Sequence, residues 1–203
     1  MPDGGRAARM ATSVSAALRG RGLPPSDQTT VLDALGCAMV PRERLLVDDH
    51  HPAFLHPGRS ILIILHDVRD RTGHAALALA ALHESRDDEL RVEAGDAARV
   101  VGGTLAEALA GLPRPGQADL AEELVLLERP AALAVVAEQL DHLRHLHLRD
   151  DLAPDRAAVC EEVAHVWGPF AERVDPRLGV RFAHWLRTFR RRLRTAARLE
   201  EPS

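Results

Sequence analysis

A helical spacing of apolar residues runs along almost the whole chain, and it limits the fold more than any other feature. From Ala11 onward, apolar side chains recur every three or four residues, and proline and glycine provide the main breaks. No internal repeat or low-complexity segment interrupts the pattern. We therefore predict an all-α fold, a helical bundle. The expected helices include residues 75–82, 96–112, 118–127, 131–148, 157–173 and 180–199.

The domain boundaries follow from the same pattern. Residues 1–11 are polar and rich in glycine and arginine, so we expect a flexible arm followed by a single helical domain over residues 12–200. Residues 41–57 begin and end with proline and hold several Asp and His, which is typical of a loop. Pro57 itself is placed to begin the next helix. Residues 90–92 give only a weak, three-residue strand signal.

Composition excludes several classes of function. The 203 residues carry a net charge of −4, which argues against a general nucleic-acid binder. All 26 basic residues are Arg and there is no Tyr, so neither a lysine Schiff base nor a tyrosine acid is available. No apolar run approaches the ~18 residues of a membrane span, and no secretory leader is visible. We expect a cytoplasmic protein in which Cys37 and Cys160 are buried thiols.

Histidine and carboxylate residues gather in three blocks at helix ends or within helices. The first block is His56-Pro57, the second begins at His83-Glu84, and the third surrounds Glu138. Helical packing can bring an imidazole, a His–carboxylate pair and a further carboxylate together. Such a mixed nitrogen and oxygen set suits Mn²⁺, Fe²⁺ or Zn²⁺, and it suits hydrolysis of phosphate esters.

The order of these blocks resembles the hydrolase domain of the RelA/SpoT family, a branch of the HD metal-dependent phosphohydrolase superfamily. The matching stretches are FLHPGRSILIILHDV at 54–68, AALALAALHESRDD at 75–88, VAEQLDHLRHLHL at 136–148 and VWGPFAERV at 166–174. The last stretch has no catalytic residue, so its match is independent of the chemistry of the other three. The resemblance implies a stand-alone (p)ppGpp 3′-pyrophosphohydrolase that uses Mn²⁺ and a small-molecule nucleotide.

The resemblance also assigns roles to particular residues. It implies metal ligands at His56, His83, Glu84 and Glu138. It implies catalytic carboxylates, which handle the attacking water, at Asp87 and Asp88. It implies substrate-binding side chains at Arg86, His142 and Arg144.

The chain departs from the family at several of these positions. Glu84 and Glu138 stand where the family has Asp, which preserves charge but lengthens the reach by one methylene. The stretch before the first block, PRERLLVDDHHPAFL, offers only Arg42 and Arg44 as cations, so the guanosine-recognition signature is not visible. Two alternatives therefore stay open. In the first, the chain is an HD phosphohydrolase for another nucleotide. In the second, it is a catalytically degenerate module that binds nucleotides or proteins.

A competing alignment uses a literal His-Asp pair. In it, His66 and Asp67 form the HD dyad and His50 or His51 supplies the first ligand. The other blocks then lose their match, so the first alignment is favoured.

The C-terminal segment is strongly basic. Eight Arg and no acidic residue occur between Arg177 and Arg198, opposite a stripe of Phe182, Trp185 and Phe189. The pattern suits an acidic partner or an oligomer contact, as well as a membrane surface or nucleic acid. It is more typical of a helix that docks on the core and leaves its Arg face in water.

Overall fold

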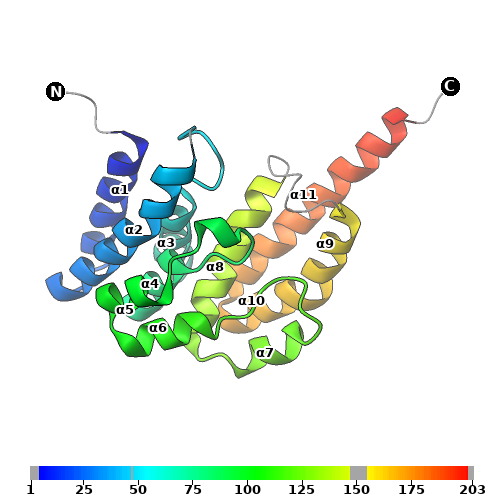
Figure 1. The fold of residues 1–203 in the computed structure, drawn as a ribbon. Coiled ribbons are helices and arrows are strands. Elements are labelled where there is room, and N and C mark those ends of the chain that lie inside the picture. The colour runs from blue at the N-terminus through cyan, green and yellow to red at the C-terminus, as the bar shows by residue number, and fades with distance from the viewer. Residues whose placement is uncertain (1–4, 47, 147–154, 201–203) are drawn as a thin grey trace.

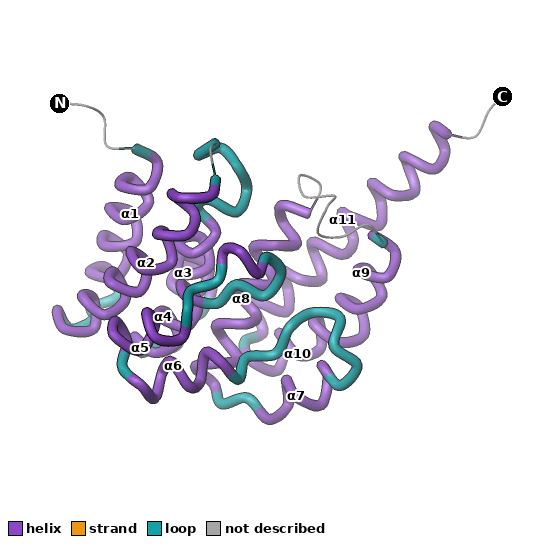
Figure 2. Tube along the Cα trace, in the orientation of Figure 1, coloured by secondary structure: helices purple, strands orange, loops and turns teal. Residues whose placement is uncertain are grey.

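The computed structural model describes residues 5–46, 48–146 and 155–200, with the backbone alone over residues 194–200. Every regular element in these ranges is a helix, which confirms the predicted all-α fold (Figure 1). Loops join the helices directly, and the described part of the chain has no strand (Figure 2). The α-helices are α1 (Arg6–Gly20), α2 (Pro25–Leu45), α3 (His56–Asp67), α4 (His74–Leu82), α5 (Ala94–Val101), α6 (Gly103–Ala110), α7 (Leu120–Leu126), α8 (Arg129–His145), α9 (Arg156–Glu162), α10 (Gly168–Val174) and α11 (Pro176–Glu200).

The short helix α4 is enclosed by α2, α3 and α8. After its first two residues it consists of alanine and leucine, and all the residues from Ala76 to Leu82 are buried. A helix that is apolar all round has no face suited to water, so neighbouring helices must cover it. Because these neighbours hold α4 in place, they also fix the start of the segment that follows it, His83 and Glu84.

Helix α8 lies between two groups of helices (Figure 1). It contacts α3 and α4 in one group, and α10 and α11 in the other. Three polar side chains in its middle, Glu138, Gln139 and Asp141, are buried with the apolar ones. Because a buried charge is stable only when it is paired, α8 must carry a network of polar contacts.

Helix α11 docks on this framework through an aromatic stripe. Phe182, Trp185 and Phe189 are buried, while Arg181 and Arg187 on other faces are exposed. The helix expected over residues 180–199 is present and begins earlier, at Pro176. None of the helices in the described ranges combines the length and the apolarity of a membrane span.

The N-terminal segment differs from the expected flexible arm over residues 1–11. Residues 1–4 lie outside the described part, and residues 6–11 form the first turns of α1. The side chain of Met10 lies against Gly58 of α3, at a site where a Cβ atom would collide with it. Arg6 also donates a hydrogen bond to the backbone oxygen of Asp49. Tertiary contacts thus hold a segment whose composition alone indicates little order.

Helix α2 continues past the proline that was expected to begin a loop. The prediction of a loop over residues 41–57 is wrong for residues 41–45, because Pro41 lies inside α2, which ends at Leu45. The next residue, Arg42, is buried and donates to the backbone oxygens of Ala38, Ala53 and Leu90. These bonds tie the last turn of α2 to the loop before α3 and to the 3₁₀ turn Asp88–Leu90, and they sustain the helix across the proline.

Other segments are more divided than the sequence suggested. The helix expected over residues 96–112 is two helices, α5 and α6, because Gly102 adopts a φ of +82° between them. The segment 157–173 contains a π-helical turn, Val163–Trp167. The weak strand signal at residues 90–92 corresponds to the end of a short 3₁₀ turn, Asp88–Leu90, and extended backbone. The end of the predicted helix 131–148 passes outside the described residues after Leu146.

The contact between α10 and α11 depends on a residue without a side chain. A Cβ atom at Gly179 would lie 2.8 Å from the Cα atom of Glu172 on α10, which is closer than such atoms approach. We expect Gly179→Ala to lower the free energy of unfolding by about 1–3 kcal/mol, because the two helices must move apart.

The control is Gly36→Ala on α2, where no heavy atom lies within 4 Å of the added Cβ atom. That variant is expected to be neutral or stabilised by up to about 1 kcal/mol, since alanine favours helix. Urea unfolding measures both. An equal loss of stability in the two variants would contradict this account of the α10–α11 contact.

Candidate functional site: a buried histidine–carboxylate centre

Three elements bring histidine and carboxylate side chains to one buried place. His56 is the first residue of α3, where Pro57 in the first turn favours a helix start. His83 and Glu84 follow the last residue of α4. Glu138 and His142 lie on α8 four residues apart, and therefore on one face of the helix. We call these five residues, His56, His83, Glu84, Glu138 and His142, the buried centre.

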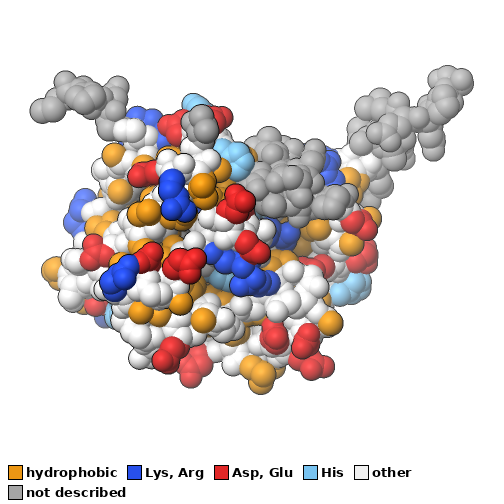
Figure 3. All heavy atoms as spheres, viewed as in Figure 1, with side chains coloured by type: hydrophobic (Ala, Val, Ile, Leu, Met, Phe, Trp, Pro, Cys, Tyr) orange, Lys and Arg blue, Asp and Glu red, His pale blue; other side chains and the backbone are white. Residues whose placement is uncertain are grey.

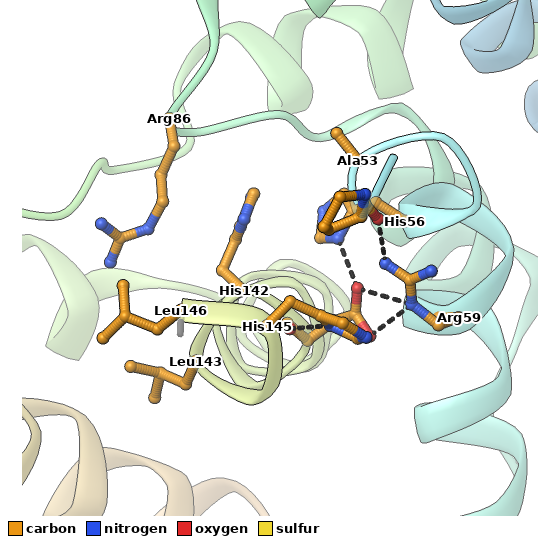
Figure 4. A pocket seen from close by; sticks show the side chains of 10 residues that line it. Ala53, His56, Arg59, Arg86, His142, Leu143, His145 and Leu146 are labelled. Carbon is orange, nitrogen blue, oxygen red and sulfur yellow. Dashed lines mark hydrogen bonds and ion pairs between the residues drawn. The ribbon is translucent and has the colours of Figure 1, made fainter. Parts of the chain in front are cut away.

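The imidazole of His56 is held by a carboxylate. Its Nδ1 atom lies 2.8 Å from Oδ2 of Asp141, and Arg59 donates to the same carboxylate at 2.8 and 3.0 Å (Figure 4). Burial opposes ionisation of Asp141, but the hydrogen bond from His56 and the charge of Arg59 hold its pKa well below the usual range. An ionised carboxylate can only accept, so Nδ1 of His56 carries the proton and Nε2 presents its lone pair. Carboxylate-held histidines of this kind are the usual arrangement around protein-bound metals.

Glu138 is fixed by the chain that follows α4. Its Oε1 atom accepts hydrogen bonds from the backbone N–H of Ser85 at 2.9 Å and from the Ser85 hydroxyl at 2.6 Å. The same oxygen lies 3.0 Å from Nε2 of His142. Glu138 therefore joins α8 to the segment that carries His83.

Glu84 is fixed in a similar way from the other side. Its Oε2 atom accepts a 2.7 Å bond from Arg42, and Oε1 accepts from the backbone N–H groups of Arg86 and Asp87, both at 3.2 Å. Oε1 also lies 3.2 Å from Nε2 of His142. The imidazole of His142 thus sits between the two glutamates.

The charges of the centre shift its pKa values in opposite directions. Burial alone would lower the pKa of His142, but Glu138 and Glu84 outweigh it and raise the pKa to about 9. Burial alone would raise the pKa of Glu138, but His142 and His83 outweigh it and lower the pKa to about 2. Burial lowers the pKa of both His56 and His83. At neutral pH, His142 is therefore a cation while His56 and His83 are neutral.

Three buried imidazole nitrogens of this centre have no hydrogen-bond partner among the described residues: Nε2 of His56, of His83 and of His142. Nε2 of His142 faces the carboxylates of Glu138 and Glu84 as an ion pair, whereas Nε2 of His56 and Nε2 of His83 belong to neutral rings. A buried polar atom without a partner is costly, and an ion or a water molecule is the common reason for one. Both imidazoles are neutral, which is the form that binds a metal. The side chains present therefore fit a divalent transition metal.

Ligand atoms of His56, Glu138 and His142 lie within 4.8 Å of one another, close enough to share one ion, although His142 would have to lose its proton to bind it. The rings of His56 and His142 are adjacent, with centroids 4.2 Å apart. The resemblance assigned a substrate-binding role to His142. In the structure its Nε2 atom lies 3.0 Å from Oε1 of Glu138 and 3.2 Å from Oε1 of Glu84, two of the expected metal ligands.

A small cavity lies beside His56 and His142. Its volume of about 10 Å³ is about the space that one water molecule needs. Arg59, Arg86 and His145 are among the residues around it, and Arg86 approaches from the segment after α4 (Figure 4). Nη2 of Arg86 donates to Oε1 of Gln139 at 3.1 Å, while Nε of Arg86 has no partner in the described part of the chain. The cavity is therefore lined by donors and by the carboxylate residue Asp141.

The structure brings together most, but not all, of the residues that the sequence singled out. His56, His83, Glu84, Glu138 and His142 converge, and Arg86 lines the adjoining cavity. Asp87 directs its backbone N–H to Glu84 and is partly buried. The charge of its carboxylate favours the protonated form of the buried Arg42.

Asp88 and Arg144 lie away from the centre. The side chain of Asp88 is 78% exposed and pairs with Arg91 and, at 3.8 Å, with Arg114. Arg144 points toward Asp67, 3.9 Å away, on the other side of α8. Two residues along a helix correspond to about 200° of rotation, so His142 and Arg144 cannot face the same way.

The competing alignment is not supported by the geometry. His66 is exposed, and Asp67 accepts hydrogen bonds from Arg181 of α11 at 2.7 and 3.2 Å. The side chain of His50 is also largely exposed. These residues share no buried site.

Sequence reasoning missed the residues that hold the ligands in place. Asp141 orients His56, Arg42 pairs with Glu84, and Ser85 donates twice to Glu138. Asp141 had a visible signal, since it lies three residues after Glu138 on the same helix face. Arg42 was noted only as a nearby cation, and nothing local indicated that it is buried.

The fold and these contacts define an all-α protein with a buried histidine–carboxylate centre. The chain matches no protein-family model, no curated protein and no solved structure.

Proposed function

We propose that the buried centre binds one divalent transition metal ion and that the protein is a metal-dependent phosphohydrolase of the HD type. The observation that carries the proposal is the pair of unpartnered Nε2 atoms, on His56 and His83, beside two ionised glutamates. His56, His83, Glu84 and Glu138 would hold the ion. Mn²⁺ fits a set with two imidazoles and two carboxylates better than Mg²⁺ or Ca²⁺, which prefer oxygen ligands alone.

Such an ion, when bound, acidifies a water molecule and neutralises charge on a phosphate. The chain's own residues would do the rest. Asp141 holds His56 in the tautomer that presents Nε2, and Ser85 holds the carboxylate of Glu138. Asp87, in the segment between Glu84 and the 3₁₀ turn, is the carboxylate we assign to positioning the water.

Donors near the centre support a phosphorylated substrate. Nε of Arg86 and Nε2 of Gln139 are buried and have no acceptor in the described part of the chain. Phosphate oxygens are suitable acceptors for both, and guanidinium groups bind phosphate particularly well. Together with the sequence resemblance, this supports a pyrophosphate ester of a nucleotide as substrate. We propose (p)ppGpp, acted on in the cytoplasm.

The test is Mn²⁺-dependent release of pyrophosphate from ppGpp by the purified protein. We expect His83→Ala to lower the rate by more than about 100-fold and to abolish metal retention, because a ligand is lost. His66→Ala is the matched control, since His66 is an exposed histidine at the end of α3. It should match the wild type.

Thermal unfolding of each variant checks that it is folded. Full Mn²⁺-dependent turnover by a folded His83→Ala protein would refute the assignment. Turnover only with a different nucleotide would retain the metal centre and replace the substrate.

A second candidate is a catalytically inactive module, and one observation favours it. The carboxylates of Glu84, Glu138 and Asp141 are matched by the cations Arg42, Arg59 and His142. The buried centre is thus close to neutral without a metal. In this candidate the protein purifies without metal, and Mn²⁺ leaves its melting temperature unchanged. Metal analysis and a thermal shift series separate the two candidates.

A further inference from the structure

A second polar cavity lies between α8 and α11, on the opposite side of α8 from the buried centre. Its volume is about 210 Å³. The polar residues that line it are Arg144 from α8 and Arg181, His184, Thr188 and Arg192 from α11. We call it the α8–α11 pocket.

This pocket carries more positive than negative charge. Asp67 is the carboxylate beside it, with Oδ1 at 2.7 Å from Nη2 of Arg181 and Oδ2 at 3.9 Å from Nη2 of Arg144. Arg192 and His184 have no ion-pair partner within the described ranges. Among the described residues, three guanidinium groups therefore line a space beside which Asp67 is the carboxylate that forms ion pairs with them.

The arginines are close enough to repel one another. Burial lowers the pKa of Arg144, and the charges of Arg181 and Arg59 lower it further, against the attraction of Asp141 and Asp67. A further anion in the pocket would relieve this repulsion. Asp141 is already paired with Arg59 and His56, so it does not offset the positive charge of the pocket.

Two stacked aromatic residues line the apolar side of the pocket. Trp185 and Phe189 are stacked with ring centroids 4.7 Å apart, and both are buried. Nε1 of Trp185 donates a 2.7 Å bond to the backbone oxygen of Leu143 on α8. The hydrogen bond links Trp185 to α8, and so joins the two helices that carry Arg144 and Arg181.

We propose that the α8–α11 pocket is a binding site for a phosphate monoester or pyrophosphate group, held by Arg144, Arg181 and Arg192. Guanidinium groups recognise phosphate oxygens through paired, charge-assisted hydrogen bonds. The pocket is smaller than the roughly 300–1,000 Å³ of sites that enclose a drug-sized ligand, so it takes the phosphate end of a molecule. The inference does not rest on the proposed hydrolase function, because no residue of the buried centre lines this pocket.

The test uses inorganic pyrophosphate as the probe, with the full-length protein in buffer that contains a metal chelator. Isothermal titration calorimetry at low salt measures the dissociation constant. We expect Arg192→Gln and Arg144→Gln each to weaken binding by about tenfold, the usual loss for one charge-assisted contact. Arg187→Gln is the matched control, because Arg187 is exposed on α11 but does not line the pocket. It should weaken binding by less than about twofold.

Two results would overturn the proposal. One is an equal loss of affinity in Arg187→Gln, which would indicate only a diffuse basic helix. The other is the absence of pyrophosphate binding by the wild-type protein at low salt. Arg192→Gln removes an exposed side chain, so this variant is not expected to unfold.

The phosphate group has two sources, a soluble compound and a lipid headgroup, and a second arm separates them. The protein is sedimented with phosphatidylcholine vesicles that contain phosphatidic acid. Co-sedimentation that pyrophosphate competes away, and that Arg192→Gln abolishes, identifies a lipid headgroup. Calorimetric binding without co-sedimentation identifies a soluble phosphate compound.

Discussion

Replacing Arg42 with alanine is expected to lower the free energy of unfolding by about 3–5 kcal/mol, the usual cost of removing one partner of a buried ion pair. The Arg42 side chain is 1% exposed and pairs with Glu84 at 2.7 Å. It also donates to backbone oxygens of α2, of the loop before α3 and of the 3₁₀ turn. Its loss leaves a buried carboxylate and several carbonyl groups without a donor. Urea unfolding measures the change.

Arg44→Ala is the matched control, because Arg44 is two residues away on the same helix and is exposed. We expect its effect to stay within about 0.5 kcal/mol. A loss below about 1 kcal/mol for Arg42→Ala would mean that water replaces the guanidinium in the centre.

The stability of the metal-free protein is expected to fall in alkaline buffer because His142 loses its proton there. The glutamates raise the pKa of His142 to about 9, above the value of about 6.5 that an unfolded chain has. The stabilisation is therefore fully present below about pH 6.5 and is lost as the pH rises through about 9. The loss is on the order of 3 kcal/mol. Urea unfolding across this range measures it.

An NMR titration of the histidine rings identifies the group responsible. One ring is expected to titrate near pH 9, and its signal should be missing from the spectrum of His142→Asn. A His142 signal that titrates below about pH 7 would contradict the charge state derived for the centre.

Much of the fold could be predicted because local pattern and tertiary structure agree in most segments. The apolar α4 and the aromatic stripe of α11 are buried as their sequences indicate. The failures occur where distant contacts override local signals. Residues 6–11 are helical because Met10 meets Gly58, and α2 passes Pro41 because Arg42 anchors its end.

The order of the three histidine–carboxylate blocks in the sequence predicted which elements carry the candidate ligands, but no more than that. The order placed His56 at a helix start, His83 after a helix end and Glu138 within a helix, and the structure brings these positions together. It gave no information on rotation about α8, so Arg144 was assigned to the same site as His142. The face of a helix that meets a neighbour depends on packing, which a short motif does not contain.

Charged residues on the face of the molecule seen in Figure 3 show why composition was a poor guide to sites. Acidic and basic side chains are interspersed there, consistent with a modest net charge of −4. The charges that the structure singles out, such as Arg42 and Asp141, are buried. The net charge of a chain does not indicate which of its charged residues are buried.

Helix α8 has a thermodynamic consequence, since one rigid element carries His142 toward the buried centre and Arg144 toward the α8–α11 pocket. A small rotation of that helix moves both side chains at once, in opposite directions relative to their neighbours. Binding free energies at two linked sites are reciprocal. If the two proposed sites bind Mn²⁺ and pyrophosphate, any factor by which one ligand changes the affinity for the other must apply equally in the reverse direction.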